Sequence, residues 1–165
     1  MATVYKELTI DDVEGMVSLF TELENEAAPV SFSRGIDRAQ ALEWIGDPDV
    51  YLFGAACDGR LVGVFRATRN PDHNKRHSCY LTAAVSRSTR NRGVATELTD
   101  YALGRLGKAG LTIARAKVYS DNTASLTVLL KCGFTISGCI HKHEYRSETK
   151  SFVDDIILHR ELSST

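Results

Sequence analysis

The sequence lacks the features that mark several large classes of protein. None of its cysteines, Cys57, Cys79, Cys132 and Cys139, belongs to a Cys-x-x-Cys pair, and each lies in an apolar stretch, which predicts buried, reduced thiols. No apolar run approaches about 18 residues, and the N-terminus has no charged-then-apolar signal pattern. The formal net charge is −1, which leaves no overall field to recruit nucleic acid or an anionic membrane. These absences predict a cytoplasmic protein without direct nucleic-acid or membrane partners.

The length and composition of the chain indicate a single domain. The chain has 165 residues, of which 43% are hydrophobic and 25% charged, and a chain of this length can bury roughly 70% of its unfolded surface. We therefore treat residues 1–165 as one domain. Hydrophobic periodicity predicts the order β-α-α-β-β-β-α-β-α-β-β. That order is typical of an α+β (mixed α/β) fold, with a central, partly antiparallel sheet of about seven strands flanked by four helices.

Capping and turn residues delimit these elements. The clearest turn is Asp58-Gly59, which joins strands 50–57 and 60–69 into a hairpin. The loop 24–35, between the first two helices, is expected to border a pocket. The remaining strands are expected at residues 3–8, 77–86, 111–119, 135–146 and 150–162, and the helices are expected to open at Asp11, Asp37, Asn91–Gly93 and Asn122.

A basic loop at the opening of the third helix indicates phosphate binding. Arg87, Arg90 and Arg92 lie between the strand 77–86 and this helix. A helix N-terminus leaves backbone N–H groups unpaired and favours an anion, and Gly93 has no Cβ to keep a phosphate away. The loop contains neither Gly-Lys-Ser/Thr nor Gly-x-Gly-x-x-Gly. The alternative interpretation is that the arginines form a solvated face.

Two motifs resemble those of a known family. Arg90-Asn91-Arg92-Gly93-Val94-Ala95 resembles the Arg/Gln-x-x-Gly-x-Gly/Ala signature of the GCN5-related N-acetyltransferase (GNAT) family. Asn122-x-Ala124-Ser125, followed by Gly133-Phe134, resembles the helix that opens with Asn-x-x-Ala in the same family. This helix and the late segments Tyr145-Arg146 and Phe152–Asp154 are more similar to the branch that contains ribosomal-protein N-terminal acetyltransferases. The resemblance covers nearly the whole chain and is firmest over residues 81–134.

The resemblance implies an acetyl-coenzyme A-dependent N-acetyltransferase that works by direct attack of an amine on the thioester. On the family model, backbone N–H groups at the helix opening hold the pyrophosphate, and the end of the strand 77–86 pairs with the pantetheine arm. The cofactor site is then Val85, Arg87, Arg90, Asn91, Arg92, Gly93, Val94, Ala95, Thr96 and Asn122. A homodimer is left open.

The catalytic residues depart from the common pattern of the family. Many members place a tyrosine acid seven residues after the Asn that opens the helix, where this chain has Leu129. Ser125 is the substitute that the branch suggests, as a hydrogen-bond donor to the departing sulfur, although a serine in a first helical turn is ordinary. Tyr119 and Tyr145 are outside candidates for the acid. For the base, the strand HSCYLTAAV offers no carboxylate, which leaves Glu26, with Tyr80 or His77 acting through water as alternatives.

The absence of an obvious strong base favours an acceptor of low pKa. At pH 7, deprotonating an amine of pKa ~10.4 costs about 4.6 kcal/mol, whereas an α-amine of pKa ~7.8 costs about 1 kcal/mol. We therefore expect a peptide N-terminus or an amino-acid-like small molecule as acceptor. The alternative function is a non-catalytic acyl-coenzyme A-binding module.

We expect no metal. His141 and His143 are spaced to share one strand face, which suits a metal ion, but no Cys or carboxylate completes a set at known ligand spacing.

Overall fold

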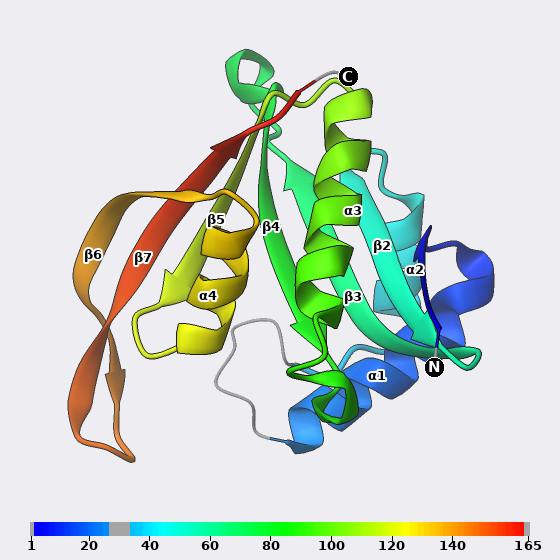
Figure 1. Cartoon of the computed structure of the whole chain (residues 1–165), viewed down its shortest axis with the longest axis horizontal. Coiled ribbons are helices and arrows are strands. Elements are labelled where there is room, and N and C mark those ends of the chain that lie inside the picture. Colours follow the sequence, from blue (N-terminus) through cyan, green and yellow to red (C-terminus); the bar gives the residue numbers. More distant parts are fainter. Residues whose placement is uncertain (1, 27–33, 164–165) are drawn as a thin grey trace.

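A computed structural model describes residues 2–26 and 34–163 of the chain. Seven strands form one sheet in the order β1-β2-β3-β4-β5-β7-β6, in which only β4 and β5 are parallel (Figure 1). The strands are β1 (Thr3–Glu7), β2 (Val50–Cys57), β3 (Arg60–Arg69), β4 (Ser78–Val85), β5 (Ile113–Tyr119), β6 (Thr135–Arg146) and β7 (Ser151–Glu161). The helices are α1 (Val13–Asn25), α2 (Arg38–Gly46), α3 (Val94–Lys108) and α4 (Thr123–Lys131), with short 3-10 turns η1 (Ile10–Asp12), η2 (His73–Lys75) and η3 (Arg87–Thr89). The predicted α+β fold is confirmed.

The residues that were predicted to form a turn or a helix end do so in the structure. Asp58 and Gly59 have φ of 49° and 80°, the left-handed pair that a two-residue hairpin requires between β2 and β3. Asp37 caps α2, since its side chain accepts the Gln40 N–H at 2.8 Å. Gly133, with φ of 78°, ends α4. Each of these residues therefore begins or ends a helix or strand through its own hydrogen bond or backbone dihedral angle.

The two faces of the sheet bury two apolar clusters. On one face, α3 and α4 pack Leu98, Leu106 and Leu129 against β-strand residues such as Phe65 and Leu158. On the other face, α1 and α2 contribute a second cluster, whose members include Met16, Phe20, Leu23, Ala41 and Val64. The helices thus lie as two layers on either side of the sheet (Figure 1). Among the described residues, no helix is long and apolar enough to cross a membrane.

The sheet is split at its centre. β4 and β5 pair only from Ser78–Ile113 to Tyr80–Arg115, after which their ends separate (Figure 1). Within residues 2–26 and 34–163, the backbone of β4 beyond Tyr80 has a strand partner only on the β3 side, and β5 continues alongside β7. The parallel strands therefore open a gap in the sheet at their carboxyl ends.

Candidate functional site

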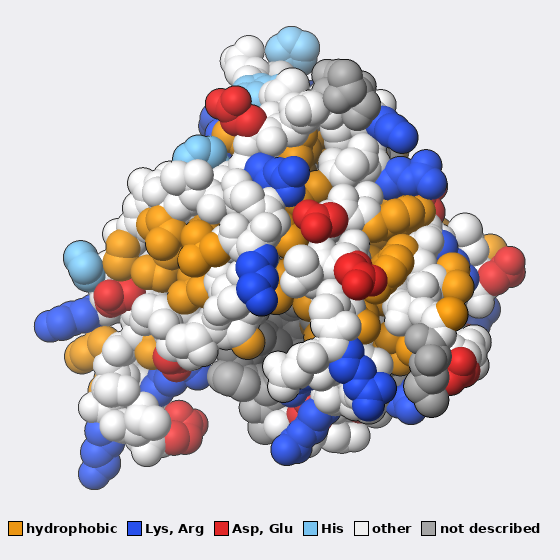
Figure 2. Space-filling view, viewed as in Figure 1, with side chains coloured by type: hydrophobic (Ala, Val, Ile, Leu, Met, Phe, Trp, Pro, Cys, Tyr) orange, Lys and Arg blue, Asp and Glu red, His pale blue; other side chains and the backbone are white. Residues whose placement is uncertain are grey.

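A cavity of about 1050 Å³ occupies the gap between β4 and β5. Figure 2 shows the surface hollowed between α4 and the N-terminal end of α3. The walls come from the ends of both strands, the opening of α3, the first two turns of α4, and a few side chains of α1, β6 and β7. Eight of the ten predicted cofactor residues line it: Val85, Arg90, Asn91, Gly93, Val94, Ala95, Thr96 and Asn122.

The opening of α3 presents unpaired backbone donors at this cavity. Gly93 caps the helix with φ of 81°, and the first bond of the helix runs from the Glu97 N–H to the Gly93 carbonyl at 3.0 Å. The N–H groups of Val94, Ala95 and Thr96 precede that bond and so have no carbonyl partner within the helix. Since all three residues line the cavity, this end of α3 can bind an anion there.

Of the three arginines predicted to bind the cofactor, one lines the cavity, and Glu26 lies beside it. Arg90 lines the cavity, whereas Arg87 and Arg92 are exposed and lie outside its wall. A carboxylate oxygen of Glu26, whose side chain is 14% exposed, lies 2.7 Å from the Arg90 guanidinium. Glu26 is not part of the cavity wall. The structure therefore joins Glu26 to Arg90 as an ion pair at the edge of the cavity.

The start of α4 forms the opposite wall. The Asn122 side chain accepts the backbone N–H of Ser125 at 3.2 Å, as a helix cap does. Ser125 is half-buried and lines the cavity. Leu129, seven residues after Asn122, is buried in the core and supplies only apolar surface to the cavity.

Polar side chains of β5, β6 and β7 continue the cavity wall. The Tyr119 hydroxyl donates to Glu144 at 2.6 Å, and this bond, together with burial, raises the pKa of Tyr119 to about 12. Tyr119 lines the cavity with Asp155 and His143. The other candidates, Tyr145, Tyr80 and His77, are exposed and lie outside the wall. A tyrosine held protonated in this way serves as a hydrogen-bond donor rather than as an acid near neutral pH.

The prediction that His141 and His143 share one strand face is wrong. His141 Nδ1 lies 3.3 Å from Asp154 Oδ2, whereas His143 Nε2 lies 3.8 Å from Asp155 Oδ2. Asp154 and Asp155 are consecutive residues of β7 and so face opposite sides of the sheet. A register shift of β6 against β7 separates the two histidines and breaks their alternation. His143 alone lines the cavity.

A cluster of ligand-type atoms lies outside the cavity wall. Cys139 Sγ, a nitrogen of His141 and an oxygen of Asp154 all lie within 4.8 Å of one another. Cys139 is exposed, which corrects the prediction that all the thiols are buried; Cys79 and Cys132 are buried and Cys57 is half-buried. Cys139 and His141 are two residues apart on β6, and the pairing of Cys139 with Ile156 brings Asp154 of β7 to the same face.

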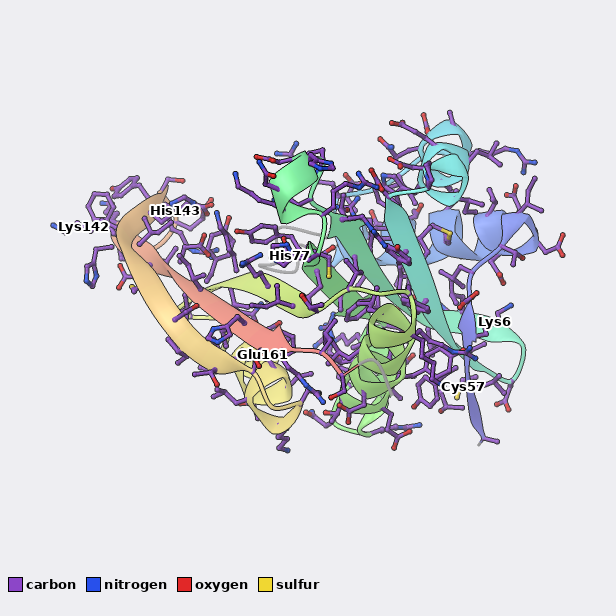
Figure 3. All side chains as sticks on the ribbon, turned by 90° about the horizontal axis from the view of Figure 1, so that it is seen from above. Lys6, Cys57, His77, Lys142, His143 and Glu161 are labelled. Atoms are coloured by element: carbon purple, nitrogen blue, oxygen red, sulfur yellow. The ribbon has the colours of Figure 1, made fainter. Side chains whose placement is uncertain are left out.

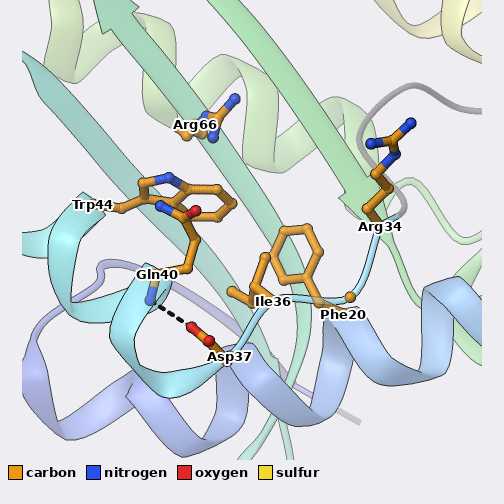
Figure 4. A pocket seen from close by; sticks show the side chains of 8 residues that line it. Phe20, Arg34, Ile36, Asp37, Gln40, Trp44 and Arg66 are labelled. Atoms are coloured by element: carbon orange, nitrogen blue, oxygen red, sulfur yellow. Dashed lines mark hydrogen bonds between the residues drawn. The ribbon is translucent and has the colours of Figure 1, made fainter.

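A smaller pocket of about 380 Å³ lies between α2 and β3 (Figure 4). The Arg66 guanidinium lies 4.3 Å from the centre of the Trp44 ring, and burial lowers the pKa of Arg66. Arg34, Asp37 and Gln40 complete the polar lining. Arg66 pairs in register with Thr82, which lines the larger cavity, so both side chains lie on the same face of neighbouring strands. Part of the loop predicted to border this region, residues 27–33, lies outside the described residues.

Comparison with known proteins places the chain among acetyltransferases. The model of the acetyltransferase (GNAT) family matches residues 17–134. A comparison with curated proteins finds no match.

Several solved structures share the fold. A GNAT-family acetyltransferase from Streptococcus pneumoniae superposes with a TM-score of 0.85 at 18% identity, over 98% of this chain and 100% of the other. A ribosomal-protein-alanine N-acetyltransferase from Brucella melitensis gives 0.83 at 16% identity, over 96% and 99%. A phosphinothricin acetyltransferase from Sinorhizobium meliloti, in complex with acetyl-coenzyme A, gives 0.85 at 16% identity, over 99% and 90%.

Proposed function

The chain belongs to the acetyltransferase (GNAT) family, and we propose that it transfers the acetyl group of acetyl-coenzyme A to a primary α-amine by direct attack. Acetyl-coenzyme A is the acyl donor, and the structurally similar acetyltransferase from Sinorhizobium meliloti was solved in complex with it. The amine is carried by a peptide N-terminus or an amino-acid-like molecule. The protein is then an N-acetyltransferase rather than an acyl-coenzyme A-binding module.

The observation that carries this proposal is the gap between β4 and β5 with the opening of α3 at its end. In our proposal the pyrophosphate is bound by the N–H groups of residues 94–96, and Arg90 adds charge beside it. The pantetheine arm lies along residues 81–85 of β4, whose backbone has no strand partner on the cavity side. The thioester then lies inside the gap, where an amine can reach it from the other face.

The chemistry needs no covalent enzyme intermediate. The amine nitrogen bonds to the thioester carbonyl carbon, the C–S bond breaks, the nitrogen loses a proton and the coenzyme A thiolate gains one. We assign Ser125 as the hydrogen-bond donor to the departing sulfur because it lies in the first turn of α4 at the cavity wall. Glu26 serves the site indirectly by holding Arg90.

The smaller pocket supports an acceptor that carries a carboxylate. Among the described residues, Arg34 and Arg66 line it with a single carboxylate, that of Asp37, so positive charge is in excess, and guanidinium groups pair well with carboxylates. Its position beside Thr82 places it next to the larger cavity. An α-amino acid would put its carboxylate in the pocket and its low-pKa amine toward the thioester.

A thiol-release assay tests the proposal. The purified protein is mixed with acetyl-coenzyme A and, in separate reactions, with free amino acids, the matching amino-acid amides, a peptide with a free N-terminus, and Nα-acetyl-lysine. We expect release of coenzyme A with α-amines and little with the lysine ε-amine. Tight binding of acetyl-coenzyme A without release on every amine would instead identify the binding module, and efficient acetylation of ε-amines alone would refute the α-amine acceptor.

A further inference from the structure

A bulge in β6 directs one histidine into the cavity. The register of β6 against β7 shifts between Ile140 and Glu144, and Lys142 within this stretch has φ of 51°. Three residues of β6, 141–143, thus lie opposite Asp154 alone, and the regular alternation of side chains is lost within this stretch. As a result His143 lines the cavity, and Figure 3 shows it on the inner side of the hairpin with Lys142 on the outer side.

A buried carboxylate stands beside this imidazole. Asp155 is 5% exposed, and its Oδ2 lies 3.8 Å from His143 Nε2. The His143 side chain itself is 44% exposed, so it has one edge at the carboxylate and another open to the cavity. That distance is longer than a hydrogen bond, but the negative charge of Asp155 stabilises the imidazolium that forms when the other ring nitrogen takes a proton.

Other charged groups lie nearby, among them Lys117 of β5, which also lines the cavity and whose ammonium lies 6.0 Å from the centre of the Tyr80 ring. Glu144, next to His143 on β6, accepts the Tyr119 hydroxyl from β5. Arg146 pairs with Asp121, which precedes α4. Asp155 of β7 is the carboxylate that lies beside the imidazole.

We propose that His143 is the general base of the transfer and that Asp155 is its positioning residue, an inference that rests on the proposed function. With Nε2 facing Asp155, Nδ1 accepts the proton that the acceptor nitrogen loses as its bond to the carbonyl carbon forms. The C–S electron pair leaves with sulfur, and the thiolate takes a proton from solvent. The imidazolium then releases its proton to solvent and is ready for another cycle. This assigns the base that the carboxylate-free strand β4 does not supply.

The test compares His143→Ala and His143→Gln with His141→Ala. His141 belongs to the same bulge but contacts Asp154 and lies outside the cavity wall, so it is a matched control. The kcat and kcat/KM values are measured from pH 5.5 to 9.5 with the best amine, and the acetyl-coenzyme A affinity of each variant is measured by calorimetry. We expect kcat to fall about 100- to 10,000-fold in both His143 variants, with cofactor affinity unchanged, and His141→Ala to behave as the wild type.

The pH profile separates a base from a structural residue. The ionisation of the acceptor amine affects the pH–rate profile of every variant equally. A fall in rate toward low pH that the wild type shows and the His143 variants lack therefore comes from the imidazole. Added imidazole should restore part of the activity of His143→Ala, and Asp155→Asn should lower kcat less than His143→Ala does. If His143→Ala turns over as fast as the wild type and its rate still falls toward low pH as in the wild type, the assignment of His143 is wrong, while the proposed function stands. A wild type that acetylates no amine would overturn the proposed function as well.

Discussion

The most informative single substitution is Gly93→Ala at the opening of α3. Gly93 has φ of 81°, and an alanine Cβ there would meet only Glu97 Oε1, at 3.5 Å, an ordinary contact. The substitution therefore causes no collision, and its cost in folding is the left-handed backbone, about 1–2 kcal/mol. For a chain of this length that lowers Tm by about 2–8 °C.

Gly93→Ala should also weaken binding of acetyl-coenzyme A. The backbone must relax at the residue that precedes the free N–H groups, and loss of one hydrogen bond to a charged phosphate costs about 1.5–3 kcal/mol, or about 10- to 100-fold in Kd. Gly59→Ala is the matched control, because Gly59 has φ of 80° and open space around it in the β2–β3 turn. We expect both variants to lose similar stability in thermal melts and only Gly93→Ala to lose affinity in calorimetry. Equal affinity in the two variants would refute the anion site at α3.

Three further predictions follow from the burial and placement of single side chains. Ser125→Ala should lower kcat about 10- to 100-fold with Kd for acetyl-coenzyme A unchanged, and an unaltered kcat would remove Ser125 from the mechanism. Iodoacetamide at pH 8 should modify exposed Cys139 before buried Cys79, and mass spectrometry of the labelled protein checks the order. Burial raises the pKa of Cys79 to about 11, and desolvation with the nearby carboxylate of Asp154 also raises the pKa of Cys139, so access to the reagent decides the order. Leu98→Ala should cost about 2–5 kcal/mol in urea unfolding, because Leu98 is fully buried, and a cost below about 1 kcal/mol would contradict the packing of α3.

Much of the fold could be predicted because its signals are local. Asp58-Gly59 sets its hairpin through its own dihedral angles, and Asp37 and Asn122 cap their helices through bonds to residues three positions along the chain. The basic loop before Gly93 marked the opening of α3 for the same reason, since the glycine and the free N–H groups belong to one short segment.

The features that were missed depend on contacts between distant segments. The ion pair of Glu26 with Arg90 joins α1 to the loop before α3, and nothing near Glu26 in the sequence indicates it. The bulge in β6 contains no glycine or proline as a marker, so simple alternation placed His141 and His143 together when the strand separates them. The bulge depends on Lys142, which has a positive φ although it is not a glycine. Residue propensities do not predict a positive φ at a lysine.

An NMR titration of the ¹⁵N-labelled protein with acetyl-coenzyme A tests the central claim most directly. If the gap between β4 and β5 holds the donor, the backbone N–H signals of residues 94–96 and of residues 81–85 should shift and saturate together. The signal of Gly59, in the distant β2–β3 turn, should stay in place. Saturable shifts confined to other parts of the sheet, with residues 94–96 unmoved, would contradict the account.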